Sequence, residues 1–421
     1  MSQLLKRVVG ALSVSVVLIG LLAGPAAAGP GLPVTRLVDD NGVQCPSAAY
    51  TSIQDAIDDA NTGDKVFVCP GTYTEQLTIN KSIIVKAQPM WGAHLNAPAG
   101  IAPTNGVVAA VAITADNATF RGFRMHIDSG PVVPTARPTA ISCTPVDVAI
   151  LVLGNNDAVR HNRINATGSA TLSGACGYGY GIAVGRESDP ATANVTFNKI
   201  RDFKFGGILI EGAGTTALVR RNAVQYLHLA ESGITPCIAT GCAQINSVNG
   251  SFAQAFGIGV EDGADARIVR NAIKSGPNAV SGNRIIVGTP ALGEGISVMN
   301  TDSGDTWIKH NAIWRTSVGI TTASDVEAVD VFENHVTTSF AWGMILSGTD
   351  AFIYDNVVQH NNLGTLVNGA NNNLHDNDFR DNDSYDCWDQ TSGGGTAGTA
   401  NTWTNNLGQD DNPDGICVSP V

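Results

Sequence analysis

A short frame built around asparagine recurs along this chain of 421 residues. The frame is an apolar residue, two variable residues, asparagine, one variable residue and a second apolar residue. Eight asparagines occupy it: Asn162, Asn198, Asn222, Asn271, Asn311, Asn334, Asn356 and Asn377. The last four follow one another at intervals of 23, 22 and 21 residues. A period of this length, with two strand-like segments in each unit, is typical of a solenoid.

A second mark, glycine followed by isoleucine or methionine, falls between the asparagine frames. It starts at Gly181, Gly207, Gly257, Gly295, Gly319 and Gly343. Alternating Val and Ile suit strands with one buried face, and the segments are too short for helices. Asparagine tolerates the left-handed conformation, so we expect it at a tight corner, where its amide can bond from coil to coil. These patterns predict an all-β right-handed parallel β-helix with coils about 4.8 Å apart. A β-sandwich with Asn in its turns is the alternative, but it predicts no constant period.

The two ends of the chain predict its division into segments. Lys6 and Arg7, the apolar residues 11–24 and the small residues 26–28 are typical of a secretion signal over residues 1–28. We then expect a lead segment over 29–49, the β-helix over 50–385 and a C-terminal cap over 386–421. The apolar stretch is shorter than the roughly 20 residues of a membrane span. The prediction is therefore a secreted, extracellular monomer without a membrane span in its mature chain.

The charge limits the partners of the mature chain. Without Lys6 and Arg7, 22 of the 24 basic residues remain against 37 acidic ones, a net charge of −15. Such a surface argues against nucleic acid and anionic membranes as partners. It also disfavours a strongly acidic polysaccharide unless cations mediate the contact. No cofactor is assigned. A series of aspartates near the end of the chain has two interpretations, a Ca²⁺ site or a plain polar cap. The series is Asp376, Asp378, Asp381, Asp383 and Asp386.

Eight cysteines in a chain with a secretion signal predict disulfides. Cys45 and Cys69 would tie down an N-terminal capping helix, and Cys387 and Cys417 would close the C-terminal cap. Cys143 and Cys176 lie in the same long loop of successive coils, and Cys237 and Cys242 can close a local ring. These pairings follow from the coil register, because a disulfide requires Cα atoms within about 7 Å.

A short helix is expected just after residue 50. Ser52 can cap it, with Asp55 three residues later. Its apolar stripe is Ile53, Ala56, Ile57 and Ala60. This helix would cover the open first coil of the solenoid, since an exposed sheet edge must be protected.

The run from Ser52 to Glu75 resembles the opening of the pectin lyase-like right-handed parallel β-helix superfamily. Its matching residues read Ser-Ile-Gln-x-Ala-Ile-x-x-Ala-x-x-Gly-Asp-x-Val-x-Val-x-Pro-Gly-x-Tyr-x-Glu. The later units resemble that superfamily's generic parallel β-helix repeats. The superfamily contains lyases, hydrolases, esterases, epimerases and non-enzymes, so the resemblance implies a fold rather than an activity. Asn300-Thr301-Asp302 matches the first catalytic motif of polygalacturonases, but the motifs that should follow are missing.

The predicted register places Glu211 and Glu261 in one outward column, on neighbouring coils if residues 229–253 form a single loop. Like charges directly opposite repel, so the pair requires a cation, a shared proton or a function. The coil spacing is close to the 5–5.5 Å that separates the carboxyls of retaining glycosidases. Our catalytic candidates are Glu211, Glu261 and Asp262. Candidate substrate-binding residues are Arg186, Lys204, Glu294 and Asp302. The alternative is that the two glutamates are ordinary solvated acids.

Four long loops, at residues 128–147, 166–180, 229–254 and 275–293, should stack on one side of the solenoid. They would form a wall beside the ladder that carries the Gly-Ile marks. Binding grooves of the superfamily that this chain resembles have a similar arrangement, with loops forming a wall beside the first strand ladder. The resemblance therefore implies that the protein binds an extracellular polysaccharide along this groove, and that any cleavage would be that of a polysaccharide lyase or glycoside hydrolase. The alternative is a non-catalytic structural or adhesive surface solenoid.

Overall fold

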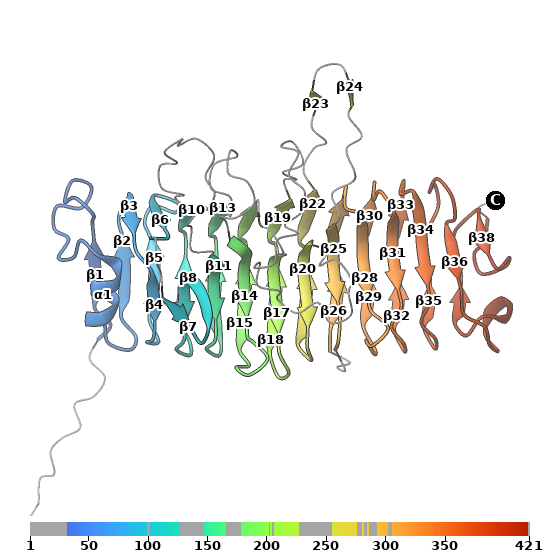
Figure 1. Cartoon of the computed structure of the whole chain (residues 1–421), viewed down its shortest axis with the longest axis horizontal. Helices are drawn as coiled ribbons and strands as arrows, with labels where there is room; N and C mark the ends of the chain where they lie inside the picture. The colour runs from blue at the N-terminus through green and yellow to red at the C-terminus, as the bar shows by residue number, and fades with distance from the viewer. Residues whose placement is uncertain are drawn as a thin grey trace, which may run out of the picture. The chain divides into compact units, whose positions relative to one another are not determined.

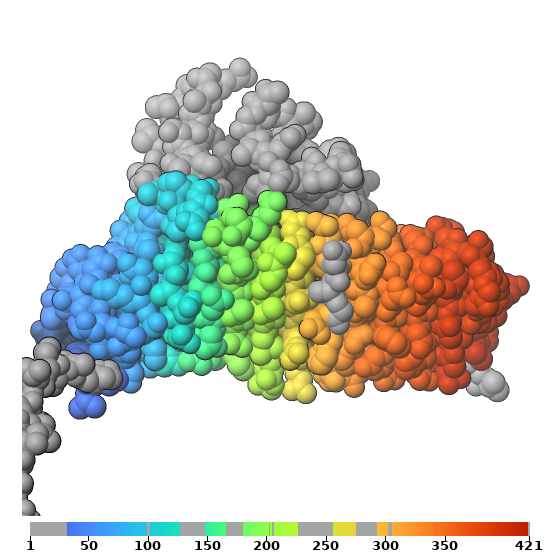
Figure 2. Space-filling view, turned by 90° about the horizontal axis from the view of Figure 1, so that it is seen from below, coloured from blue at the N-terminus to red at the C-terminus, as the bar shows by residue number. Residues whose placement is uncertain are grey.

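The computed structural model describes residues 32–98, 102–126, 146–165, 178–201, 203, 206–226, 255–275, 280–281, 284–285, 293–301 and 305–419. The unit Val34–Val421 is built from three long sheets of parallel strands. Successive strands of the chain visit the three sheets in turn, so each coil up to β33 adds one strand to each sheet, and the later coils add strands to the first and third sheets (Figure 1). In Figure 2 the colours of this unit follow in bands from blue to red, because each coil stacks on the one before it.

The strands of the three sheets are given in the order in which they pair. The first sheet contains β1 (Thr35–Val38), β2 (Lys65–Val68), β5 (Ile84–Ala87), β9 (Thr119–Arg121), β12 (Asp157–Arg160), β15 (Thr192–Thr196), β18 (Thr216–Arg220), β21 (Asp265–Val269), β26 (Trp307–Lys309), β29 (Asp330–Phe332), β32 (Phe352–Tyr354), β35 (Asn373–His375) and β37 (Thr402–Thr404). The second contains β3 (Gly71–Thr74), β6 (Ala93–Asn96), β10 (Arg124–His126), β13 (Arg163–Asn165), β16 (Lys199–Arg201), β19 (Ala223–Tyr226), β22 (Ala272–Ser275), β27 (Ala312–Trp314), β30 (His335–Thr337) and β33 (Val357–Gln359). The third contains β4 (Leu77–Ile79), β8 (Val107–Ile113), β11 (Val146–Val152), β14 (Tyr178–Val184), β17 (Gly206–Glu211), β20 (Ala255–Glu261), β25 (Gly293–Val298), β28 (Val318–Thr322), β31 (Trp342–Leu346), β34 (Leu363–Val367), β36 (Cys387–Asp389) and β38 (Asp411–Asn412).

The remaining elements are short. β7 (Pro103–Thr104) pairs antiparallel with β8, and β23 (Val280–Ser281) pairs antiparallel with β24 (Arg284–Ile285). The helical elements of the described residues are α1 (Ile53–Asp59) and the 3₁₀ turn η2 (Thr396–Gly398). The predicted right-handed parallel β-helix is confirmed. Parallel pairing starts at β1, before residue 50, and continues to β38, after residue 385. The paired strands therefore extend beyond both ends of the solenoid proposed over residues 50–385.

The Gly-Ile mark has a steric cause. In the third sheet the isoleucine of each mark points into the core, and Ile208, Ile258 and Ile296 are fully buried. The glycine before it also faces inward, against the next coil. A Cβ on Gly207 would lie 2.6 Å from the carbonyl oxygen of Gly257, a contact that real side chains do not make. Only glycine lets the coils stack at this corner.

The predicted asparagine ladder is confirmed, and it fixes the coil register. The Asn222 side-chain oxygen accepts hydrogen bonds from the backbone N–H and the amide of Asn198, at 2.9 and 3.1 Å. The Asn222 amide donates in turn to Asn271 and to the carbonyl of Val195, at 3.1 and 2.8 Å. The same pattern runs from Asn162 to Asn377, and it continues to Asn406, which the sequence frames did not include.

The conformation proposed for these asparagines was wrong. The left-handed residue of each corner is the one before the asparagine, as at His161 (φ 57°), Phe197 (φ 58°) and Arg221 (φ 55°). The asparagines themselves are buried, with Asn162 and Asn198 fully so. Asparagine is therefore needed for its amide, which satisfies buried backbone groups in two neighbouring coils, and not for its tolerance of positive φ.

Helix α1 caps the first coil as expected. The Ser52 side chain accepts from the Asp55 N–H at 3.2 Å, and Ile53, Ala56 and Ile57 are fully buried. The carboxylate of Glu75 receives the N–H groups of Ile53 and Gln54 at 3.0 and 2.9 Å. Negative charge at a helix N-terminus is favourable, so Glu75 fastens the helix to the coil below.

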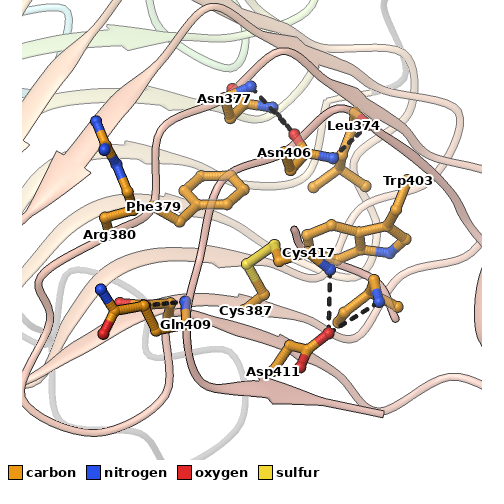
Figure 3. The surroundings of a disulfide bond; sticks show 12 residues. Leu374, Asn377, Phe379, Arg380, Cys387, Trp403, Asn406, Gln409, Asp411 and Cys417 are labelled. Atoms are coloured by element: carbon orange, nitrogen blue, oxygen red, sulfur yellow. Dashed lines mark hydrogen bonds between the residues drawn. A yellow bond between two sulfur atoms is a disulfide. The ribbon is translucent and has the colours of Figure 1, made fainter. Parts of the chain in front are cut away.

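Both predicted cap disulfides are present. Cys45 pairs with Cys69 and Cys387 with Cys417, with Cα separations of 6.3 and 6.4 Å. Near the second bond, the Asp411 carboxylate accepts from the N–H groups of Gly415, Ile416 and Cys417, which folds the last residues back (Figure 3). Cys143, Cys176, Cys237 and Cys242, like residues 1–28 of the proposed signal, lie outside the described residues. None of the helices in the described part of the chain has the length and apolar character of a bilayer span.

Replacing Asn271 with alanine should lower the free energy of unfolding by about 2–4 kcal/mol, because it leaves buried donors and acceptors of two coils unpaired. The matched control is Asn194→Ala, an exposed asparagine of β15, which should change stability by less than about 0.5 kcal/mol. Urea unfolding curves of the two variants measure both values. Equal effects would contradict a stabilising role of the ladder.

Replacing Cys387 and Cys417 with serine should lower the free energy of unfolding by about 2–4 kcal/mol, since the bond closes a loop of moderate length. The loss should start at the last coil. Hydrogen exchange should therefore speed up first in β36 and β38, while β8 and β11 keep their protection. Uniform loss of protection along all three sheets would contradict a local closing function.

Candidate functional site

Two glutamates stand opposite each other on the outer face of the third sheet. Glu211 ends β17 and Glu261 ends β20, and the two residues are direct partners in the register of these parallel strands. The predicted neighbouring position of the pair is thus confirmed. Adjacent strands lie about 4.8 Å apart, so the two carboxyl groups emerge side by side.

Burial changes the ionisation of this pair. It raises the pKa of Glu261 to about 7, and the carboxylate of Glu211 adds to the shift. Burial also raises the pKa of Glu211, but the guanidinium of Arg186 opposes that rise. One carboxyl group therefore holds its proton near neutral pH beside a partner that ionises first. Like-charge pairs are the arrangement in which a proton is shared in this way.

Arg186 and Asp262 belong to the corner next to the pair. Arg186 follows β14, and its backbone exchanges two hydrogen bonds with Asp189. Asp262 directly follows Glu261 in the left-handed conformation (φ 55°), and its carboxylate accepts from the Asn300 amide at 2.7 Å. The structure therefore brings together the acidic pair, one positive side chain and a third carboxylate. Whether these residues bind or catalyse remains a prediction.

Glu294, a predicted substrate-binding residue, lies near the start of its strand, whereas Asp262 follows the end of β20. It is the second residue of β25 and pairs with Phe256 of β20. Burial raises its pKa, and the hydroxyls of Ser297 and Thr321 oppose that rise. Glu294 still contributes to the raised pKa of Glu261. It therefore extends the electrostatic field of the site along the outer face of the sheet.

Aromatic rings on the same face were missed from the sequence. Tyr180 and Phe256 lie with ring centroids 6.1 Å apart, above the small residue Gly206 that pairs with both in the register. Phe256 is buried in a second apolar cluster on this outer face, together with Leu209 and Ala183. This part of the outer face is therefore largely shielded from solvent. The signal was available, because both rings directly precede a Gly-Ile mark.

Several predicted parts of the site lie outside the described residues: Lys204, Asp302 and most of each long loop. The proposed groove wall therefore stays a prediction. Two hollows occur elsewhere on the described chain. One of about 270 Å³ lies beside α1 and β1, and one of about 340 Å³ lies on the first sheet around Thr216 and Arg267. Among the described side chains, no group of three or more His, Cys, Asp or Glu is placed to hold a metal ion.

Replacing Glu261 with glutamine should make the melting temperature less dependent on pH. The folded protein keeps the proton on Glu261 up to about pH 7, whereas an ordinary glutamate ionises near 4.5. Wild-type stability should therefore fall as pH rises through this window, and the variant should not share that part of the fall. Burial also raises the pKa of Asp157 to about 7. Both proteins contain Asp157, so its contribution to the pH dependence cancels in the comparison. Parallel melting curves from pH 4 to 8 would contradict the raised pKa.

Comparison with known proteins supports the fold. A model of the family described as "periplasmic copper-binding protein (NosD)" matches residues 276–419. XylC in complex with xylose shares 10% identity over 82% of this chain and 75% of that one, with a TM-score of 0.50. An alginate lyase from Paenibacillus sp. str. FPU-7 shares 12% identity over 76% of this chain and 92% of that one, with a TM-score of 0.46.

A mannuronan C-5 epimerase module of Azotobacter vinelandii, AlgE4, shares 10% identity over 85% of this chain and 90% of that one, with a TM-score of 0.46. No curated protein sequence matches the chain significantly. At these identities the likeness is one of fold. The expected resemblance is thereby confirmed at the level of fold: the chain is a right-handed parallel β-helix.

Proposed function

We propose that this protein binds an extracellular polysaccharide on the outer face of the third sheet, around Glu211 and Glu261. The observation that carries the proposal is the pairing of these two buried carboxyl groups in direct register. Two carboxyl groups on adjacent strands cost stability, by repulsion when both are ionised and by proton uptake when one is not, so their position is explained by a ligand better than by stability. Sugar hydroxyls can donate to the ionised carboxylate and accept from the protonated carboxyl group.

Further features of this face support a sugar ligand. Tyr180 and Phe256 provide an apolar surface next to polar groups, a combination typical of small-molecule and sugar sites. Arg186 provides a positive charge beside the acidic pair. The cap disulfides fit a protein that works in an oxidising compartment outside the cytoplasm.

Hydrolysis of a glycosidic bond is a second candidate, and the unequal ionisation of the pair favours it. Glu261 would donate its proton to the leaving oxygen, because burial and the charge of Glu211 raise its pKa to about 7. Glu211, held toward the ionised form by Arg186, would act as nucleophile or base. Asp262 would keep the proton on Glu261 by its negative charge. The activity of such a pair falls as pH rises above the pKa of the acid.

A copper centre is not supported by the part of the matched family region that the structure describes. Copper prefers Cys, Met and His ligands. In this region Cys387 and Cys417 are bonded to each other. Nε2 of His310 lies 2.9 Å from the Glu333 carboxylate, and Nδ1 of His375 lies 2.9 Å from the Asp376 carboxylate. The two histidines belong to different coils. These donors do not converge, and we assign them no role in copper binding.

The proposal is tested with a polysaccharide array, run with and without calcium and scored for binding and for new reducing or unsaturated ends. Glu211→Gln/Glu261→Gln should lose at least about tenfold in affinity for the bound glycan, with an equal or higher melting temperature because repulsion is relieved. The charge-matched control is Glu327→Gln/Asp350→Asn, two exposed acids on other coils, which should bind like the wild type.

The possible outcomes separate the candidate functions. Reducing ends that disappear in Glu261→Gln would establish hydrolysis, whereas unsaturated ends would indicate a lyase. Binding without new ends would leave a carbohydrate-binding protein. Retention of the whole ligand profile in the double variant, or no ligand on the array, would overturn the proposal in favour of a structural or adhesive solenoid.

A further inference from the structure

A row of positive side chains crosses the coils at the end of the first sheet. Lys86, Arg121 and Arg160 are direct register partners on β5, β9 and β12. Thr196 occupies the position on β15, and Arg220 continues the row on β18. Register partners on adjacent strands lie about 4.8 Å apart, so this row of like charges runs straight along the solenoid and is interrupted only at Thr196.

A second row runs parallel to the first, across the corner that the asparagine ladder forms. Arg124, Arg163 and Lys199 are register partners on β10, β13 and β16. Each follows its counterpart in the first row by three residues, as Arg163 follows Arg160. The buried asparagines hold the spacing of the coils constant under both rows. We call these two rows the basic strip.

The basic strip has no acidic partners within the described residues. The ion pairs among the described residues all join other side chains, and none of them includes a lysine or arginine of the strip. The Nε atoms of Arg121, Arg124, Arg160 and Arg220 are buried and have no hydrogen-bond acceptor. Buried polar groups are nearly always paired in native proteins, so four orphan donors on one surface require an explanation. These Nε atoms are enclosed, so an anionic ligand would meet the outer N–H groups of the same half-buried side chains.

Repulsion inside the strip adds to this cost. Burial lowers the pKa of Arg121, and the charge of Arg160 lowers it further. His161, at the corner between the rows, is affected in the same way: burial lowers its pKa, and Arg160 and Arg121 add to the shift. The whole chain is acidic, with a net charge of −13. Positive charge gathered against repulsion in an acidic protein is not explained by stability.

Aromatic rings hold the cations in place and indicate the shape of the ligand. Arg163 and Lys199 lie over the ring of Trp91, at 4.8 and 5.2 Å from its centroid. The Trp91 indole donates to the carbonyl of His161 at 2.6 Å, which fixes the ring. A guanidinium stacked on a ring keeps the N–H edge that matches a carboxylate in a fork. The ring face is covered by cations, so it offers no platform for a nucleic-acid base.

The straight course of the strip distinguishes between two classes of polyanionic ligand, a nucleic-acid duplex and a linear acidic polysaccharide. Phosphates of a DNA duplex follow a helix and leave a straight line after a few positions. A linear polysaccharide with a carboxylate on its sugars can follow consecutive coils. We propose that the basic strip is a second binding site, for a linear acidic polysaccharide whose carboxylates contact the arginines of successive coils. It lies on the first and second sheets, does not involve Glu211 or Glu261, and does not depend on the function proposed for them.

The experiment measures the affinity of the mature chain for polygalacturonate by calorimetry, with EDTA present so that no divalent cation bridges two acidic groups. Dextran serves as neutral polysaccharide and a short duplex as nucleic acid. Arg160→Gln/Arg220→Gln should weaken polygalacturonate binding at least about tenfold, because hydrogen bonds to charged groups are lost. The melting temperature should stay equal or rise, which excludes unfolding as the cause.

Arg267→Gln/Arg315→Gln removes the same charge from exposed arginines outside the strip and should change affinity less than about twofold, since exposed charges are screened. Glu211→Gln/Glu261→Gln should leave polygalacturonate binding intact, and this result separates the strip from the site on the third sheet. Equal losses in both arginine variants, absence of polygalacturonate binding, or equally tight binding of the duplex would each overturn the proposal.

Discussion

The close stacking of coils in a constant register is the constraint on which the rest of this structure depends. Two features impose it. The buried asparagine ladder bonds each coil to both neighbours through side-chain amides, as Asn222 does between Asn198 and Asn271. The inward glycines, such as Gly207, allow the backbones to approach to a distance that a Cβ would prevent. Every residue at an equivalent position is therefore aligned with its counterpart in the next coil.

Alignment of this kind turns a repeated side chain into a column, and a repeated charge into a column of like charges. Glu211 and Glu261 illustrate this on the third sheet, and Arg121 and Arg160 on the first. In an ordinary globular fold, side chains can turn away from such neighbours. Here the strand register holds them about 4.8 Å apart. A column of like charges without counter-charges lowers the stability of the fold. This structure has an acidic column on the third sheet and a basic column on the first.

The two charged surfaces also differ in their surroundings. The acidic pair is partly buried beside the apolar cluster that contains Leu209 and Phe256, which raises its pKa values. The basic strip lies at a corner where Arg163 and Lys199 stack over the ring of Trp91. Average composition describes neither surface. The net charge argues against acidic partners for the chain as a whole, yet the strip concentrates positive charge locally.

The sequence by itself determined the coil architecture, because the periodic frames report the same contact once per coil. It also determined the cap helix, the two cap disulfides and the partnership of Glu211 with Glu261, since each follows from counting residues within a coil. It did not determine which corner residue takes the left-handed conformation, because Asn suits both that conformation and a buried ladder. Only the tertiary structure decided this, and only it revealed the raised pKa of Glu261, the position of Glu294 at the far end of its strand, and the basic strip. These properties depend on burial and on the neighbours across coils, which lie 20 to 50 residues away in the sequence and carry no local pattern.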